Sequence, residues 1–565
     1  MRYFSLHNGH DASVTAFEDG EIVMHFELER HFGVKHLAGV EFGNAVGDAI
    51  TLLLSKLNWS LVDIKAILFC GLRDWGGNWT RTEFHQVTKD RVYSKEIDKP
   101  YLIWSSNWRG LPMTFVGITH HVNHMAYAYY TSPFEKSIIF AIDGKGDFGI
   151  NCTYGTGCGS KLNYLGNTSW ENPMKIAFAN IGISYSLLGV LFPFLGLDPL
   201  ACAGKAMGLS SYGQAVDDWR LLVKEVLFPN DIRDYIDEVD SLSWAATKKN
   251  IDKLKSSLDI DYGNPNCKST QDLMATIQDE FERYMVLCVR KLSNNYDIQS
   301  ICLSGGCALN CQVNSRILNE KAIEKLYVPP ACSDSGLSIG AGLYYWHNIL
   351  GNQFKGQENH IPYLGDLLLV NHKKNKRIFE KTLDKESLLD FVSSKISEGK
   401  IIAWAQGRSE IGPRALGNRS ILCAPYPNEM KDKVNEKIKH REFWRPFAPV
   451  CLEECVSDWF EIDHAQPYML ECPSVKKDKK DLIPAVTHVD GTARVQTVNR
   501  RDNTLLYDLV KKFKDKTGVP VLMNTSLNDK NKPIANDSKS ILDMLINTEL
   551  DYVVINNSIY GKLTH

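Results

Sequence analysis

The sequence predicts an α/β protein whose N-terminal part contains two copies of one strand-rich unit. The first copy begins with a strand at residues 2–6 that runs into Asp11, and Asp19-Gly20 then separates two strand-like runs, a strong hairpin signal. The second copy begins with an apolar strand at 137–142 that ends in Asp143. Each copy thus carries an aspartate at the turn after its first strand, and we expect the two copies to face one cleft.

A helix, a strand and a glycine turn extend this core. Apolar residues recur at helical spacing across residues 272–292, and a short buried strand at 300–303 leads into Gly305-Gly306. A glycine pair between a strand and a helix start lets the backbone approach a nucleotide and offers it free N–H groups. We therefore predict a nucleotide-binding cleft formed by Asp143, Gly144, Lys145, Gly305, Gly306 and Asn310.

Composition excludes several classes of protein. A chain of 565 residues exceeds one hydrophobic core, and 44% apolar with 23% charged residues is typical of globular proteins. Lys+Arg 64 against Asp+Glu 67 gives a net charge of -3, which argues against a nucleic-acid partner. The first residues do not resemble a signal peptide, no apolar stretch is long enough to span a bilayer, and the fourteen cysteines form no CxxC pair. We expect a cytoplasmic protein with reduced thiols and no membrane partner.

The pattern of strands and helices weakens between about residues 348 and 385, where Gly, Asn, Gln and Lys predominate. Beyond this stretch, arginines and lysines recur among glycines. We therefore predict a first domain at 1–350, a connecting segment at 351–384 and a second domain at 385–565.

A histidine pair suggests a metal site in the first domain. His120 and His124 are four residues apart, so on a helix both imidazoles project from one face. Asp334, at the start of a glycine-rich helix, offers a third ligand, and such a set suits Fe(II), Mn(II) or Zn(II). His121 is the alternative ligand if the helix starts one residue later. Histidines that only cap or pack a helix end would give the same spacing, and the residues alone leave both interpretations open.

Basic residues suggest a polyanion site in the second domain. Arg408, Arg414 and Arg419 alternate with glycines that let the backbone come close to a ligand, and guanidinium groups bind phosphate oxygens in pairs. The same pocket could include Lys439, Arg441, Arg445, Arg494, Asn524 and Ser526. A solvated basic surface is the alternative, but interleaved Gly, Pro and Trp are unusual on such a surface.

Nine short motifs follow one another between residues 5 and 528, in the order that one known protein family shows: HNGHDAS, HHVNHMAYA, AIDGKGDFG, AGKAMGL, LSGGCALNCQVN, SDSGLSIGAG, GRSEIGPRALGNRSIL, KHREFWRPFAPV and MNTSLN. Through them the whole chain resembles the O-carbamoyltransferase family of antibiotic and nodulation-factor biosynthesis (NodU/CmcH type). The resemblance implies two domains. The N-terminal one is ASKHA-type, similar to the subunit that transfers threonylcarbamoyl to tRNA, and the C-terminal one is similar to YrdC, which makes a carbamoyl-type adenylate.

Carried over by motif, the resemblance implies an iron-type metal held by His120, His124 and Asp334. In the second domain it implies that carbamoyl phosphate and ATP, the latter with Mg(II), meet Arg414, Lys439, Arg441, Arg445, Arg494, Asn524 and Ser526. The asparagine and serine stand in the reverse of their order in YrdC, a reversal that this family shares.

The expected reaction is an ATP-dependent O-carbamoyl transfer. Carbamoyl-adenylate forms from carbamoyl phosphate and ATP in the C-terminal pocket, and the carbamoyl group then passes to a hydroxyl of a small natural product in the N-terminal cleft. The candidates for catalytic groups there are His10, Asp11 and Lys35. His10 and Asp11 could instead only hold the first hairpin.

Three other functions share parts of this pattern. A tRNA-modifying threonylcarbamoyl-type transferase has the same domain types, but the charge of -3 disfavours it. An ASKHA-type phosphotransferase leaves the arginine-rich C-terminal third unexplained, and a non-catalytic nucleotide-binding scaffold does not need the histidine pair. The sequence leaves open the acceptor, the native metal and whether the chain forms a homodimer.

Overall fold

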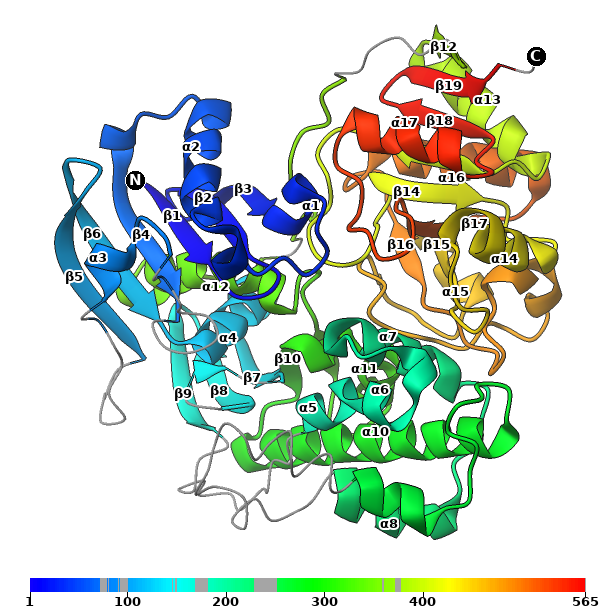
Figure 1. Cartoon of the computed structure of the whole chain (residues 1–565), viewed down its shortest axis with the longest axis horizontal. Helices are drawn as coiled ribbons and strands as arrows, with labels where there is room; N and C mark the ends of the chain where they lie inside the picture. Colours follow the sequence, from blue (N-terminus) through cyan, green and yellow to red (C-terminus); the bar gives the residue numbers. More distant parts are fainter. Residues whose placement is uncertain are drawn as a thin grey trace. The chain divides into compact units, whose positions relative to one another are not determined.

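The structure is a computed structural model. It describes residues 1–71, 79, 81–89, 91, 100–144, 146–147, 150–167, 181–227, 251–357, 360–370 and 377–563. The chain divides into two compact units (Figure 1). Unit 1 comprises Met1–Leu28 and His36–His360, and unit 2 comprises Glu29–Lys35 and Ile361–His565.

The division differs from the predicted domains in two ways. Unit 2 starts at Ile361, and β12 (Ile378–Thr382), inside the predicted connecting segment 351–384, pairs with β19 (Ser558–Lys562) as part of the sheet of unit 2. The short segment Glu29–Lys35 also belongs to unit 2. Arg30 ties it there by donating to the backbone oxygen of Glu410 at 2.7 Å and that of Gly412 at 2.5 Å.

Unit 1 contains two sheets with the same core topology, as the duplicated pattern predicted. In each, a three-stranded antiparallel meander is followed by a strand parallel to the first. The first sheet has the order β3-β2-β1-β4-β6-β5, with β1 (Arg2–His7), β2 (Ser13–Glu18), β3 (Glu21–Glu27), β4 (Ile64–Cys70), β5 (Tyr101–Trp108) and β6 (Leu111–Ile118). The second has the order β11-β10-β7-β8-β9, with β7 (Lys136–Ile142), β8 (Cys152–Cys158), β9 (Lys161–Asn167), β10 (Ser300–Ser304) and β11 (Lys325–Tyr327). Unit 1 thus has the duplicated α/β topology that the sequence analysis expected.

Local sequence explains the main elements of unit 1. Asp19 and Gly20 both have positive φ, 51° and 84°, which suits a tight turn between paired antiparallel strands. The helix expected at 272–292 is α10 (Lys268–Tyr296), and its buried face includes Leu273, Ile277 and Phe281. Unit 1 also contains α1 (Leu28–Phe32), whose last four residues belong to unit 2, and α2 (Ala45–Leu57), α3 (His85–Thr88), α4 (His120–Tyr130), α5 (Ile181–Ser186), α6 (Leu188–Leu191), α7 (Pro199–Ser210), α8 (Asp217–Leu227), α11 (Cys311–Leu318) and α12 (Leu337–Tyr344).

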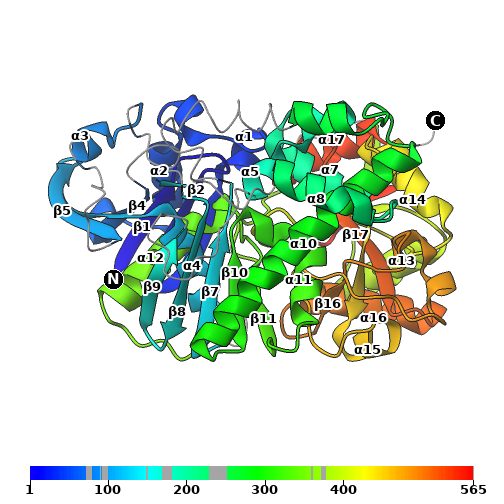
Figure 2. The same ribbon diagram turned by 90° about the horizontal axis from the view of Figure 1, so that it is seen from below.

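Two helices join the sheets of unit 1. α12 packs on β1, β2 and β4 of the first sheet, α4 packs on β7, β8 and β10 of the second, and the two helices pack on each other. On the outside, α10 lies against β7 and β10 and against α7, α8 and α11 (Figure 2). The N-terminal ends of α4 and α12 thus lie near the chain turns that follow β1 and β7.

Unit 2 is built on one mixed sheet of eight strands. Its order is β12-β19-β18-β13-β14-β17-β15-β16, with β13 (Ile402–Ala405), β14 (Arg419–Cys423), β15 (Ala448–Leu452), β16 (Gln496–Val498), β17 (Val521–Ser526) and β18 (Tyr552–Ile555). α13 (Lys385–Ser397) and α16 (Thr504–Thr517) pack together against β14, β15 and β17, and α17 (Ser538–Asn547) packs on β18 and β19. The remaining helices are α14 (Glu429–Val434) and α15 (Val456–Trp459). The YrdC-like relationship remains a prediction.

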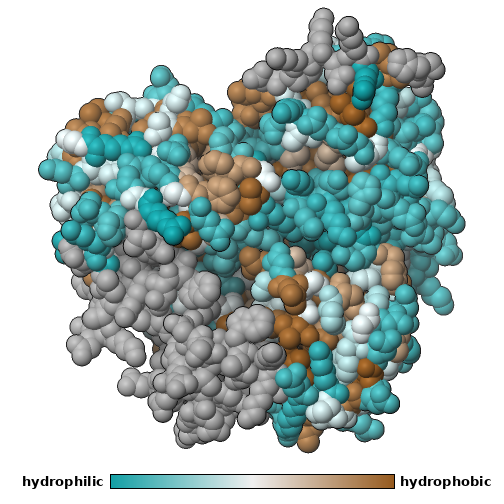
Figure 3. All heavy atoms as spheres, viewed as in Figure 1, coloured by the Kyte–Doolittle hydropathy of each residue, from teal (hydrophilic) through white to brown (hydrophobic). Residues whose placement is uncertain are grey.

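Among the residues coloured by hydropathy in Figure 3, hydrophilic ones predominate, and apolar ones form separate smaller groups. Among the described residues, no helix is both long and apolar enough to cross a membrane. The cysteines are free thiols, as predicted, and nearly all are buried.

Candidate functional site

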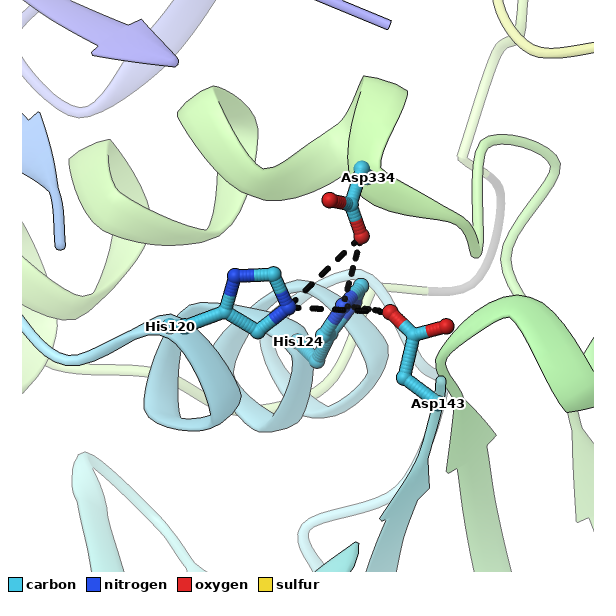
Figure 4. A group of neighbouring side chains, drawn as sticks. All are labelled: His120, His124, Asp143 and Asp334. Carbon is cyan, nitrogen blue, oxygen red and sulfur yellow. Dashed lines mark hydrogen bonds and ion pairs between the residues drawn. The ribbon is translucent and has the colours of Figure 1, made fainter. Parts of the chain in front are cut away.

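Four side chains converge in unit 1: His120 and His124 from α4, Asp143 after β7, and Asp334 before α12 (Figure 4). The Nε2 atoms of His120 and His124 lie 3.6 and 3.3 Å from Oδ1 of Asp334, and 3.6 and 3.1 Å from Oδ2 of Asp143. The structure thus brings together the three residues of the predicted metal site. It adds Asp143, which the sequence had assigned to nucleotide binding.

The local fold explains why these groups meet. α4 starts at His120, so residues 120 and 124 project from one face, and the backbone N–H of His120 donates to Asp147 Oδ2 at 2.9 Å. The other oxygen of Asp143, Oδ1, accepts from Gly306 N at 3.1 Å. Asp143 therefore links the histidine cluster to the predicted glycine turn. The signal that could have indicated this role was its position at the end of β7, directly after a buried strand.

The cluster has the chemistry of a metal site. Each of the four residues offers one ligand atom, and these four atoms all lie within 4.8 Å of one another. Among the described residues, the buried Nε2 of His120 and Oδ1 of Asp334 have no hydrogen-bond partner. Burial lowers the pKa of His124, but Asp143 and Asp334 overcome this and raise it to about 9. Burial raises the pKa of Asp143, but the neighbouring imidazoles of His120 and His124 hold it well below its usual value. Two imidazoles and two carboxylates fit a divalent transition metal such as Fe(II).

A chain of imidazoles and carboxylates continues from Asp334 to the first hairpin. His10 Nε2 lies 3.3 Å from Asp334 Oδ2, and His10 Nδ1 lies 3.1 Å from Asp11 Oδ2. The second oxygen of Asp11 lies 2.8 Å from Nδ1 of His36, a residue that the sequence analysis did not select. Burial lowers the pKa of His10, but Asp334 and Asp11 together raise it to about 10. Both predicted groups, His10 and Asp11, therefore adjoin the metal-type cluster.

Two of the predicted nucleotide residues, Gly144 and Gly306, donate backbone hydrogen bonds to Asp143. Gly305 has a φ of 91°, and a side chain there would meet the backbone of Ile142, so this turn requires glycine. Asn310 caps α11 by accepting from Val313 N at 3.3 Å and also exchanges hydrogen bonds with Gln278. Gly144 follows Asp143 directly and donates to Oδ1 of that aspartate. Lys145 lies outside the described residues.

Lys35 directly precedes His36, the partner of Asp11, and its catalytic role stays a prediction. Lys35 belongs to the short segment of unit 2 and not to unit 1, which holds His10 and Asp11. Its charge is one of those that lower the pKa of Lys439, after burial and the charges of Arg441 and Arg445. The structure therefore relates Lys35 to the predicted polyanion site of unit 2, called here the cation-lined site.

That second site collects four basic side chains, of which Lys439 is buried and the three arginines are half-buried. Burial, followed by the charges of Arg445 and Arg494, holds the pKa of Arg441 well below its usual value, and burial also lowers the pKa of Arg445. Nε of Arg494 is buried and has no hydrogen-bond partner among the described residues. Such mutual repulsion destabilises the folded chain unless an anion offsets it, so we interpret the group as a polyanion site.

Lys439 reaches the end of β17. Its Nζ donates to Ser526 O at 2.7 Å and Oγ at 3.2 Å, and also to the backbone and side-chain oxygens of Asn528. Asn528 was missed by the sequence analysis, although it is the last residue of the quoted MNTSLN motif. Lys439 thus holds the predicted ligand Ser526 in place, in addition to supplying charge.

Two of the three arginines in the GRSEIGPRALGNRS motif have structural roles. Arg419 is fully buried and donates to the backbone oxygens of Gln406, Asn418, Asp366 and Gly407. Arg408 donates to the backbone oxygens of Leu364 and Gly365. Both guanidinium groups stabilise turns by donating to backbone oxygens. The prediction that all three arginines bind phosphate is therefore wrong for these two. Arg414, half-buried, stays a predicted ligand.

Comparisons with known proteins agree with this two-part organisation. The chain matches the family described as Carbamoyltransferase N-terminus over residues 4–343 and that described as Carbamoyltransferase C-terminus over residues 393–562. The chain belongs to the carbamoyltransferase family. This carbamoyltransferase is 32% identical to nodulation protein NolNO of Sinorhizobium fredii (98% of this chain, 79% of the relative). It is 31% identical to nodulation protein NolO of Bradyrhizobium diazoefficiens (78% of each chain).

Solved structures resemble the carbamoyltransferase more distantly. HypF of T. kodakarensis is 12% identical with a TM-score of 0.34 and covers 62% of this chain and 48% of its own. The activator of 2-hydroxyisocaproyl-CoA dehydratase from Clostridium difficile is 16% identical with a TM-score of 0.32, over 62% of this chain and 95% of its own. Likenesses of this size carry no argument about the site.

Proposed function

We propose that this carbamoyltransferase works in two steps at its two sites. In the cation-lined site of unit 2, water cleaves carbamoyl phosphate to carbamate and phosphate, and carbamate then attacks the α-phosphate of ATP, which gives carbamoyl-adenylate and releases pyrophosphate. In the histidine–aspartate site of unit 1, a hydroxyl of a small natural product attacks the carbamoyl carbon, and AMP leaves. The proposal rests above all on the clustered cations, namely the buried Lys439 and the half-buried Arg441, Arg445 and Arg494, whose mutual repulsion calls for a polyanionic ligand.

The chemistry requires activation because carbamate is a poor electrophile and a hydroxyl is a poor nucleophile. Joining the carbamoyl group to AMP creates a good leaving group. The basic side chains offset the negative charges of carbamoyl phosphate and of the triphosphate of ATP, which repel each other when both are bound. Arg445 and Arg494 would bind phosphate oxygens. Lys439 would hold Ser526 and the end of β17 against them.

In unit 1, His120, His124, Asp143 and Asp334 would hold the divalent metal. When bound, such an ion supplies a positive charge that polarises a carbonyl oxygen. Asp11 orients His10 through Nδ1, which directs Nε2 of His10 toward Asp334. Nε2 of His10 would accept the proton of the acceptor hydroxyl. Proton acceptance needs a neutral imidazole. A metal ion held by the four ligands would offset the negative charge of the carboxylates that raise the pKa of His10. It would thereby lower that pKa and favour the neutral imidazole.

Two single substitutions should separate the two steps. Arg445→Ala should stop the formation of pyrophosphate and of carbamoylated product, because a phosphate contact is lost. His124→Ala should leave exchange of pyrophosphate into ATP intact and stop transfer to the acceptor. Mass spectrometry would detect the gain of one carbamoyl group on candidate alcohols.

Lys512→Ala is a matched control, because Lys512 pairs on the surface with Glu386 and Asp390. It should leave both steps unchanged. Normal adenylate formation by Arg445→Ala would contradict the assignment of the pocket. Loss of pyrophosphate exchange in His124→Ala would contradict the division between the units.

A further inference from the structure

We infer that Asn524 selects the carbamoyl group by accepting a hydrogen bond from its NH2, and that Gln496 is the positioning residue that fixes Asn524 in this orientation. The inference rests on the proposed binding of carbamoyl phosphate in unit 2. It assigns one ligand atom to Asn524, and it adds Gln496 to the site.

Asn524 is buried in the middle of the sheet with one free acceptor. It is 1% exposed, and on β17 it pairs with Leu422 of β14 and Ala448 of β15. Its Nδ2 donates to Ala415 O at 3.1 Å and to Gln496 Oε1 at 2.8 Å. Its Oδ1 is buried and has no hydrogen-bond partner among the described residues. Both donor positions of this amide are therefore used, while its acceptor is left open.

Gln496 determines which way the Asn524 amide faces. Gln496 is 2% exposed, and its Nε2 donates to Leu416 O at 2.8 Å. A backbone oxygen can only accept, so the NH2 end of Gln496 must face Leu416 and its oxygen must face Asn524. Ala415 O imposes the same requirement on Asn524 directly. A rotated Asn524 amide would set oxygen against oxygen at both contacts, which burial makes unfavourable.

The open acceptor belongs to the cation-lined site. Asn524 and Ser526 are two residues apart on β17, so their side chains lie on the same face of the sheet, and Ser526 contacts Lys439. A phosphate oxygen would be repelled by the open acceptor of Asn524, since neither carries a proton. The ligand must therefore present a donor at this point. In carbamoyl phosphate, the NH2 group is that donor. A methyl group in its place, as in an acetyl group, or an ionised oxygen, as in a carboxyl group, offers no donor at neutral pH.

The test compares two stable phosphonates that differ only at this position. Phosphonoacetamide carries the NH2 group, and 2-oxopropylphosphonate carries a methyl group instead. Calorimetric titration of the full chain should show that the wild type binds the amide roughly 10- to 100-fold more tightly, because the methyl ketone leaves a buried acceptor unpaired. Asn524→Leu should bring the ratio close to one while affinity for inorganic phosphate changes little.

Gln496→Leu tests the positioning role. It should reduce the selectivity ratio several-fold, while inorganic phosphate still binds as in the wild type, a combination that general damage to the pocket would not give. Thr525→Val is the matched control, since Thr525 lies on the opposite face of β17, and it should keep both the ratio and the phosphate affinity. Should Gln496→Leu not fold, as judged by circular dichroism, Asn524→Leu still decides the role of the acceptor.

The outcomes separate this inference from the proposed function. Equal affinity of the wild type for both phosphonates, with phosphate still bound, would overturn the role of Asn524 and leave the polyanion site standing. An unchanged ratio in a folded Gln496→Leu protein would overturn the role of Gln496. If the wild type bound neither phosphonate nor inorganic phosphate, the proposed carbamoyl phosphate site itself would be wrong.

Discussion

Glu410 is a fully buried carboxylate that supports the cation-lined site from behind. Its Oε1 accepts from the backbone N–H groups of Leu416, Asn418 and Arg419, at 2.6, 3.3 and 3.2 Å. The carbonyl groups of the same turn, at Ala415 and Leu416, receive the amides of Asn524 and Gln496. One acidic side chain thus organises the turn to which the ligand-facing amides are attached.

Glu410→Ala should destabilise unit 2 and weaken ligand binding together. Loss of the carboxylate leaves buried N–H groups unpaired, at ~1–3 kcal/mol for each that finds no new partner. We expect the unfolding free energy to fall by a few such increments in urea titrations and the affinity for carbamoyl phosphate to fall about tenfold. Glu398→Ala, which removes an exposed partner of Lys395, is the control and should change neither. Unaltered stability of Glu410→Ala would show that the turn does not depend on this carboxylate.

His360 makes the stability of unit 1 depend on pH. Burial lowers its pKa to about 3, so the folded chain keeps this imidazole neutral where the unfolded chain, with an ordinary pKa near 6.5, takes up a proton. Its contribution to stability is therefore complete above pH 6.5 and is lost as the pH falls toward 3. In urea titrations between pH 7.5 and 5, wild type should lose stability more steeply than His360→Gln, by up to ~1.4 kcal/mol per pH unit. Equal slopes would contradict a neutral buried His360.

At the residue scale, the sequence indicated side chains whose spacing alone brings them together. The four-residue interval between His120 and His124 needs only a helix, and α4 provides it. Asp143 could not be assigned to the same cluster, because its place there depends on how β7 meets α4. Arg408 and Arg419 show the reverse: a glycine-rich arginine motif does not reveal whether a guanidinium faces a ligand or the backbone of its own turn.

At the element scale, the histidine–aspartate cluster depends on how closely α4 and α12 approach each other. Gly340 on α12 lies directly against the backbone of α4, and a Cβ added there would lie 1.9 Å from the oxygen of Asn123. Asp334 precedes α12, and His120 and His124 lie on α4. The glycine therefore sets the distance between the two sides of the cluster.

Gly340→Ala should push the helices apart and impair metal binding. We expect a loss of ~1–3 kcal/mol in stability from overpacking, and a lower content of bound metal at equal metal concentration, measured by elemental analysis. Gly204→Ala is the matched control, because Gly204 is an exposed glycine in α7 with open space around it. That substitution should raise stability by ~0.5–1 kcal/mol and leave metal content unchanged. A Gly340→Ala protein with full metal content would contradict the spacing argument.

Elements with strong local signals were predicted, and those defined by distant partners were not. The Asp19-Gly20 hairpin and α10 follow from turn chemistry and apolar periodicity. β12 lies in a polar stretch whose residues are mostly exposed, so only its pairing with β19 makes it a strand. The transfer of Glu29–Lys35 to unit 2 likewise depends on contacts such as those of Arg30, which no local pattern encodes.

At the scale of the whole molecule, each of the two units holds one of the two candidate sites. The metal-type cluster and the His10–Asp11 pair lie in unit 1, and the clustered cations lie in unit 2 together with Lys35. In the proposed mechanism, activation and transfer thus use separate sets of side chains. Carbamoyl-adenylate is the one species that both steps share, since the first produces it and the second consumes it.

Added carbamoyl-adenylate should therefore restore transfer in a chain whose cation-lined site is inactive. Arg445→Ala, supplied with the synthetic intermediate and an acceptor alcohol, should form carbamoylated product without ATP, because unit 1 keeps all the groups that the second step uses. We expect partial recovery, since the intermediate is labile in water and part of it hydrolyses before it binds. Product is measured by mass spectrometry as the gain of one carbamoyl group.

The double variant Arg445→Ala/His124→Ala supplies the control for this rescue. It should form no product above the uncatalysed rate, because transfer then lacks the histidine–aspartate cluster. Rescue that survives in the double variant would mean that unit 1 does not catalyse transfer. If Arg445→Ala with its metal content confirmed formed no product at any concentration of intermediate, then Arg445 would be needed after activation as well, and the assignment of one step to each unit would be mistaken.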